Sequence, residues 1–126
     1  MDPADRKYTQ EHEWIQLEGE VAVVGITHFA QDQLGDVVYV ELPKVGDRIE
    51  QMKPFGVIES VKTASDLFAP VTGTVVEVND TLGEQPQSVN DEPYAAGWLI
   101  KVKPDSAGDV ETLMTAEQYG EHVGKA

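Results

Sequence analysis

The chain alternates between short β-branched runs and clusters of turn residues, and this pattern most limits the folds open to it. Such runs occupy residues 21–26, 36–42, 74–79 and 98–103, and a weaker strand is predicted over residues 48–51. In the last run Trp98, Ile100 and Val102 alternate with Lys101 and Lys103, as in a strand with one buried face. Turn signals recur about every 8–12 residues. The pattern therefore predicts a mostly β fold, a sandwich or barrel with helical additions.

Helices are predicted at two places outside these runs. A short helix near residues 28–34 has Thr27 as its N-cap and Gly35 as the glycine that follows its last turn. Apolar residues spaced through the last part of the chain indicate one or two C-terminal helices, and Thr115 with Gln118 forms a capping-box pattern.

A β-hairpin is predicted over residues 55–70, with Lys62 near its tip. Residues 61–64 include no Gly, Asn or Asp, the residues that usually occupy hairpin turns. Small residues flank Lys62, and Glu59 and Asp66 stand close enough in sequence to pair with its ammonium group. A tip that departs from turn chemistry and presents an amine suggests that the amine serves another purpose. The alternative is an ordinary solvated lysine.

The charge balance is strongly acidic. The chain has 126 residues, of which 23 are acidic and 9 basic, with a formal net charge of -14. This disfavours binding to nucleic acids or anionic membranes and favours basic protein partners, although dispersed acids also serve solubility. With 40% hydrophobic residues the chain can form one core. We expect a single domain over residues 1–126, with residues 1–6 frayed, and a monomer.

Several function classes are excluded or disfavoured by missing residues. The absence of cysteine excludes disulfides, thiolate metal sites and a cysteine nucleophile. No apolar run approaches the length of a membrane span, and the N-terminal residues have neither a signal-peptide nor a transit-peptide composition. This fits a cytoplasmic protein, or the mature form of an organellar protein whose leader has been removed.

No self-contained active site is evident. The histidines, His12, His28 and His122, lack the spacing of a metal site, so no metal is expected. Neither a nucleophile elbow nor a phosphate-binding glycine loop is present. The chemistry is therefore expected from a group attached to the lysine at the hairpin tip, such as lipoamide or biotin.

The segment ESVKTASD, residues 59–66, resembles the lipoylation signature of the glycine cleavage system H-protein family. Other segments are similar to the same family: residues 12–14 (HEW), 25–27 (GIT), 30–31 (AQ), 34–43 (LGDVVYVELP), 70–79 (PVTGTVVEVN) and 93–102 (PYAAGWLIKV). Biotin carriers have methionines beside the lysine, where this chain has Val61 and Thr63. Lipoyl domains of 2-oxo acid dehydrogenases usually have Asp before it.

The resemblance implies a flattened barrel-sandwich of the lipoyl/biotinyl type, built from two antiparallel sheets. It implies that lipoate is covalently attached to Lys62, with a supporting set formed by Glu59, Ser60, Val61, Ser65 and Asp66. The chain would then be a non-catalytic carrier rather than an enzyme.

The same resemblance implies a set of partners. The carrier would take an aminomethyl group from glycine decarboxylase (P protein, with pyridoxal phosphate) to aminomethyltransferase (T protein, with tetrahydrofolate). Dihydrolipoamide dehydrogenase (L protein, with FAD) would reoxidise it, and a lipoyl ligase or transferase would load it. Two alternatives stay open: a lipoyl carrier or donor for another multi-enzyme complex, and an interaction module whose lysine is idle.

The resemblance also implies a docking place for the arm, which is the Lys62 side chain with its lipoyl group, when it carries the aminomethyl group. Glu13 and Asp66 match positions where a carboxylate pairs with the amine of the carried group; the alternative for each is an ordinary surface acid. The chain departs from the family at His28-Phe29 and at Gln33, on the predicted short helix. This departure bears on contacts between that helix and the arm, and does not bear on the assignment of Lys62.

Overall fold

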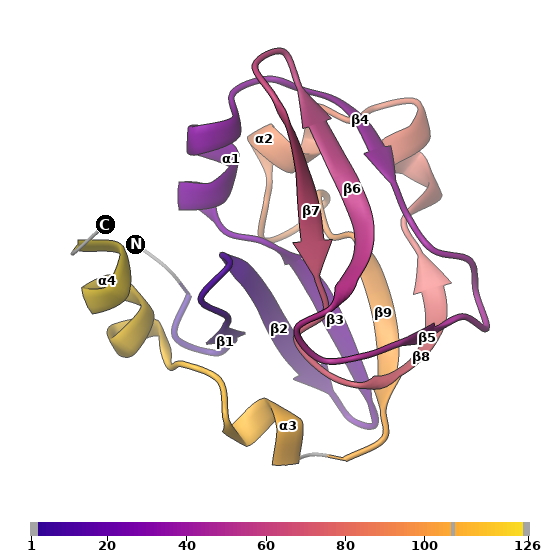
Figure 1. Ribbon diagram of the computed structural model, residues 1–126, viewed down its shortest axis with the longest axis vertical. Coiled ribbons are helices and arrows are strands. Elements are labelled where there is room, and N and C mark those ends of the chain that lie inside the picture. Colours follow the sequence, from indigo (N-terminus) through magenta and orange to yellow (C-terminus); the bar gives the residue numbers. More distant parts are fainter. Residues whose placement is uncertain (1–2, 107, 125–126) are drawn as a thin grey trace.

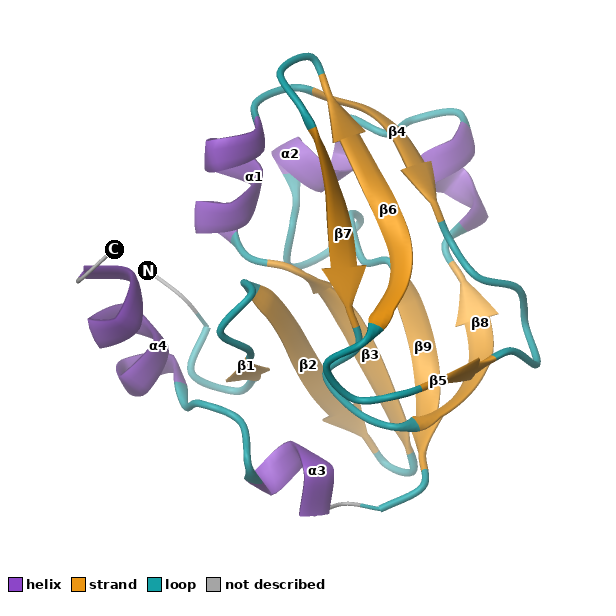
Figure 2. Cartoon of the chain, viewed as in Figure 1, coloured by secondary structure: helices purple, strands orange, loops and turns teal. Residues whose placement is uncertain are grey.

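Two antiparallel sheets face each other in the computed structural model, which describes residues 3–106 and 108–124 (Figures 1 and 2). The larger sheet has the order β1 (Lys7–Tyr8), β2 (Glu13–Glu18), β3 (Val21–Ile26), β9 (Ile100–Pro104), β8 (Gly73–Val78) and β5 (Arg48–Ile49). The smaller sheet has the order β4 (Val37–Glu41), β6 (Pro54–Ser60) and β7 (Ala64–Phe68). The predicted fold class, two antiparallel sheets with added helices, is confirmed.

The core fills the space between the sheets. Ile58 and Leu67 from the hairpin strands are buried together with Val24, Val75 and Val102 from the larger sheet. Burying one such side chain stabilises the fold by about 1.5–3 kcal/mol, so the hairpin is anchored by its inward face. The outward-facing residues of the hairpin are therefore not needed to anchor it to the core.

A second cluster joins the two ends of the chain to the larger sheet. It consists of the buried side chains of Tyr8, Trp14, Val23 and Tyr119. Arg6 lies over the Trp14 ring, with 4.4 Å between its guanidinium carbon and the ring centroid. Stacking on an aromatic face favours this position of Arg6. The fraying of residues 1–6 stays a prediction, and residues 1 and 2 lie outside the described residues.

The helices begin and end where the capping residues predict. In α1 (His28–Leu34) the Thr27 hydroxyl accepts a hydrogen bond from the Ala30 amide, and Gly35 follows with φ +80°. The capping box also forms. The Gln118 amide donates to the Thr115 hydroxyl, and the Thr115 amide donates to the Gln118 side chain.

The other helices lie in the second half of the chain. The last part of the chain forms α3 (Gly108–Glu111) and α4 (Ala116–Gly124). Between β8 and β9 the chain forms a 3-10 turn, η1 (Asp80–Gly83), and one turn of helix, α2 (Ser88–Asp91). In the part of the chain described, no helix has the length and apolar character needed to cross a membrane.

Candidate functional site

Ser60 builds the turn at the end of the β6–β7 hairpin. Its amide donates to the Thr63 carbonyl at 2.8 Å, and its hydroxyl accepts from the amides of Lys62 and Thr63, each at 3.2 Å. A serine hydroxyl thus supplies the local hydrogen bonds that Asn or Asp supplies in other turns. None of residues 60–64 has a positive φ, which explains why the tip needs no glycine.

The side chain of Lys62 lies over Gly35, at the junction of α1 and β4. A Cβ atom added to Gly35 would come within 3.2 Å of Lys62 Cε and 3.6 Å of Cδ. The Val61 amide donates to the Asp36 carbonyl at 3.0 Å and fixes the tip to this junction. The predicted pairing of Lys62 with Glu59 or Asp66 is not seen among the described residues, because the stem is directed toward Gly35 instead.

Asn90 of α2 holds this junction in place. Its side-chain oxygen accepts from the Val37 amide at 2.8 Å. Its side-chain nitrogen donates to the Gly35 carbonyl at 2.9 Å and to the Gln31 side chain at 3.0 Å. One side chain therefore fixes both the end of α1 and the start of β4 beneath Lys62. Sequence reasoning missed Asn90, because its partners Val37 and Gly35 lie 53 and 55 positions away in the sequence.

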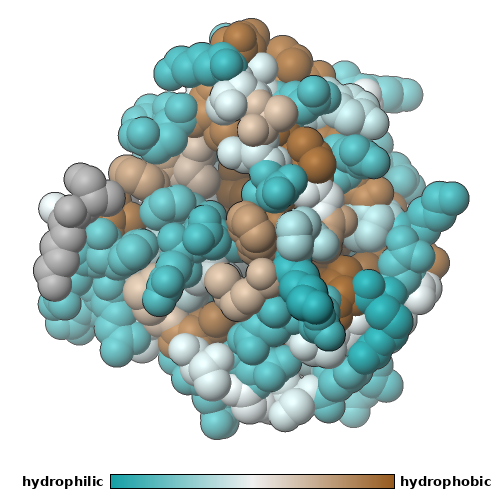
Figure 3. Space-filling view, viewed as in Figure 1, coloured by the Kyte–Doolittle hydropathy of each residue, from teal (hydrophilic) through white to brown (hydrophobic). Residues whose placement is uncertain are grey.

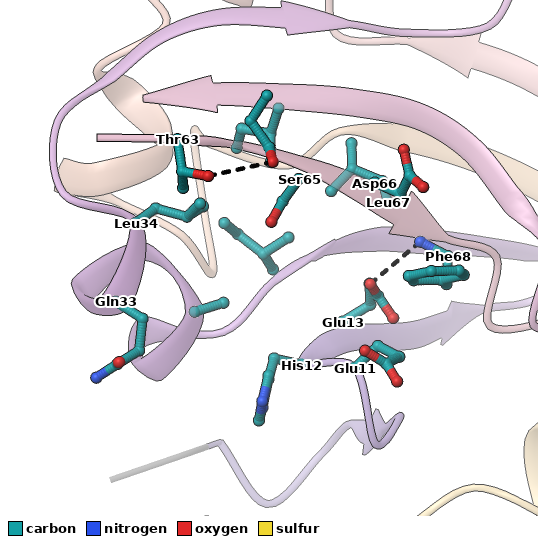
Figure 4. Close-up of a pocket in the computed structure, with 14 residues that line it drawn as sticks. Glu11, His12, Glu13, Gln33, Leu34, Thr63, Ser65, Asp66, Leu67 and Phe68 are labelled. Carbon is teal, nitrogen blue, oxygen red and sulfur yellow. Dashed lines mark hydrogen bonds between the residues drawn. The ribbon is translucent and has the colours of Figure 1, made fainter. Parts of the chain in front are cut away.

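A groove of about 450 Å³ runs between the hairpin, α1 and the start of β2 (Figure 4). Apolar side chains form much of its surface, and it is bordered by polar residues. The lining residues are Glu11, His12, Glu13, Ile26, Ala30, Gln33, Leu34, Ile58, Thr63, Ala64, Ser65, Asp66, Leu67 and Phe68. Of the predicted supporting residues, Ser65 and Asp66 line the groove, whereas Glu59 and Val61 are exposed outside it.

Glu13 is a buried carboxyl at this groove, not a surface acid. Its side chain is 1% exposed and points from β2 toward β7, where the Phe68 amide donates to it at 3.2 Å (Figure 4). The Thr9 hydroxyl donates to its other oxygen. Burial raises the pKa of Glu13 to about 8, while the hydrogen bonds from Thr9 and Phe68 act in the opposite direction. The surface alternative for Glu13 is therefore wrong.

The divergent positions on α1 differ in their relation to the groove. Gln33 lines it. Phe29 packs against the His12 ring, with 4.8 Å between the ring centroids. Nδ1 of His12 lies 2.7 Å from the Tyr119 hydroxyl, which lies 2.7 Å from the Thr27 hydroxyl. Burial, followed by the nearby His122, lowers the pKa of His12. Phe29 thus supports one wall of the groove from behind.

Within residues 3–106 and 108–124, no three side chains of the metal-binding types lie close enough together to hold an ion. The exposed amine of Lys62 and the adjoining groove are accordingly the features around which a function can be argued. The geometry fits a covalently attached group with an apolar chain that folds into the groove.

Comparisons with known proteins agree with the resemblance. The family model described as glycine cleavage H-protein matches residues 6–126. The glycine cleavage system H proteins of Bacillus pumilus and Bacillus subtilis are each 57% identical over 119 residues, which is 94% of this chain and 94% of each relative. A crystal structure of the H protein from Mycobacterium marinum superposes with a TM-score of 0.90 at 41% identity, covering 98% of this chain and 99% of that one. The chain belongs to the glycine cleavage H-protein family.

Proposed function

We propose that this protein is the lipoyl-bearing shuttle of the glycine cleavage system and that Lys62 is its attachment site. The observation that carries the proposal is the position of Lys62: an exposed amine on an anchored hairpin, beside an apolar groove, in a chain of this family. A lipoyl group amide-linked to Lys62 would supply a dithiolane whose S–S bond is reduced as it takes up the aminomethyl group at the decarboxylase. Transfer of that group at the aminomethyltransferase would leave a dithiol, which dihydrolipoamide dehydrogenase would reoxidise to the dithiolane.

The residues of the groove fit such a group. Ala30, Leu34 and Leu67 offer an apolar surface to its hydrocarbon chain. Glu13 offers a buried carboxyl to a protonated amine at its end. Because its pKa is about 8, Glu13 is mostly protonated at neutral pH when no cation is near. A nearby cation favours the ionised carboxylate, so Glu13 gives up its proton as the amine settles. Asp66 lines the same groove and provides a second carboxylate.

The attachment is tested by intact mass after incubation with lipoate, ATP and a lipoate–protein ligase. We expect the mass of one lipoyl group on the native protein and none on Lys62→Arg. Lys44→Arg is the matched control, since Lys44 also lies in a turn between strands. A lipoyl gain that survives Lys62→Arg would refute the assignment.

The shuttle role is tested by glycine–bicarbonate exchange with the pyridoxal-phosphate decarboxylase. The lipoylated protein should support exchange, and the Lys62→Arg variant should not. A lipoylated protein that is inert here would instead favour service to another multi-enzyme complex.

The role of the groove is tested by the lifetime of the loaded form. Glu13→Ala should release the carried aminomethyl group faster than the native protein. If the lifetime is unchanged, the carboxyl does not hold the arm, whatever the outcome for Lys62.

A further inference from the structure

Three exposed apolar side chains gather beside the hairpin tip on the side of the sheet away from the groove. Val38 and Tyr39 on β4 are 53% and 52% exposed, and Val61 at the tip is 67% exposed. The strand order β4-β6-β7 places β4 on one edge of the sheet, whereas the groove is lined by β7 on the other. We call Val38, Tyr39 and Val61 the β4 patch.

A β-bulge creates the exposed pair on β4. Val37 pairs with Ser60, but Tyr39 pairs with Glu59, so Val38 is the extra residue. Successive residues of a regular strand point to opposite faces, and the bulge removes this alternation. Two neighbouring apolar side chains are thereby left in solvent next to the tip. Figure 3 shows hydrophobic side chains at this end of the molecule.

Two carboxylates flank the patch. Glu59 stands opposite Tyr39 in the sheet, and Glu41 lies two residues along β4. The segments 36–42 and 57–66 together contain four acidic residues, and their only basic residue is Lys62. The surface around the lysine thus has an apolar centre and a negative border. Its complement is an apolar recess bordered by Lys and Arg side chains.

This inference rests on the proposed function. The position of the patch favours one of the partners of that function, the enzyme that modifies the lysine. An enzyme that modifies the bare amine must bring the end of the Lys62 side chain into its own active site. It therefore has to contact the protein surface at the tip itself. Enzymes that act on the far end of an attached lipoyl group can work a cofactor's length away from this surface.

We propose that the β4 patch, bordered by Glu41 and Glu59, is the docking surface for the enzyme that attaches lipoate to Lys62. The patch forms the apolar centre of that interface, and the carboxylates face basic residues of the enzyme. No residue of the patch lines the groove on the other edge of the sheet.

The chain supplies a matched pair of variants. In β8 Val75 pairs with Val102 and Glu77 with Lys101, so Val76 is also the extra residue of a bulge, and it is 40% exposed. Val38→Lys places a positive charge in the patch, and Val76→Lys makes the same change on the larger sheet. Initial rates of lipoylation by a lipoate–protein ligase are measured against the concentration of each acceptor. We expect Val38→Lys to raise KM about tenfold or more with kcat nearly unchanged, and Val76→Lys to stay within about twofold.

Each outcome bears on one claim. If the native protein is not lipoylated, the proposed function fails before the patch is tested. If the native protein is lipoylated and the two valine variants behave alike, the patch is not the docking surface. The proposal is also overturned if the ligase KM is unchanged while the KM in glycine–bicarbonate exchange rises, since the patch then serves the decarboxylase. Tyr39→Ser, which removes the ring without adding charge, replaces Val38→Lys if that variant does not fold, and should also raise KM.

Discussion

The buried carboxyl of Glu13 predicts a specific pH dependence of folding stability. Its pKa is about 8 in the folded protein, against 4.5 for a carboxyl in water. The folded state therefore holds this proton more tightly than the unfolded chain does. The contribution to stability is fully present below pH 4.5 and is lost as the pH rises toward 8.

The magnitude follows from the same two values. One pH unit corresponds to about 1.4 kcal/mol per proton, so the contribution lost between pH 4.5 and about 8 approaches 5 kcal/mol. Typical domains unfold at a cost of about 5–15 kcal/mol, so a loss of this size is readily measured. Substituting Glu13→Gln keeps the shape of the side chain and removes the titration.

The assay is urea unfolding at one-unit intervals from pH 5 to pH 9, followed by the fluorescence of buried Trp14. The unfolding free energy of the native protein should fall relative to that of Glu13→Gln by roughly 1 kcal/mol per pH unit up to pH 8. Glu11→Gln, which removes an exposed carboxylate nearby, controls for the change in net charge. Parallel curves for the native protein and Glu13→Gln would refute the reasoning.

Three further predictions concern packing, a buried network and surface charge. Gly25→Ala should lower the unfolding free energy by at least about 2 kcal/mol in urea melts, because the added Cβ would lie 2.5 Å from the Trp14 ring; an unchanged midpoint would show that the ring can move. Tyr119→Phe should cost about 1–3 kcal/mol by thermal unfolding, since His12 and Thr27 lose their shared hydroxyl, and equal stability would mean that water replaces it. Raising the salt concentration should raise the KM for this carrier in the exchange assay, because the net charge of -14 attracts basic surfaces; a salt-independent KM would contradict this.

Local signals in the sequence predicted those parts of the structure that depend on neighbouring residues. The caps of α1 and α4 were predictable because Thr27 and Thr115 bond to residues only three positions away. The hairpin was predictable because two apolar runs flank a short polar segment. The turn chemistry at Ser60 was less accessible, since a serine hydroxyl can bond locally in many conformations.

The site itself depends on contacts between distant segments. Glu13 looks like an exposed strand residue until β7 covers it, because the Phe68 amide that bonds to it lies 55 residues later. The β4 patch depends on a bulge, and the bulge arises because the pairing of β4 with β6 shifts by one residue. Neither arrangement leaves a mark in the spacing of apolar residues.

Asn90 carries a consequence for any attempt to transplant the lysine. Its hydrogen bond to the Gly35 carbonyl joins residues 55 positions apart, and neither belongs to the segment 59–66. A synthetic peptide of that segment, or the same hairpin grafted onto another scaffold, would keep every residue of the signature. It would lose the hydrogen bonds by which Asn90 holds the junction of α1 and β4 beneath Lys62. The orientation of the Lys62 side chain is thus a property of the whole domain, and transferring the hairpin alone would not preserve it.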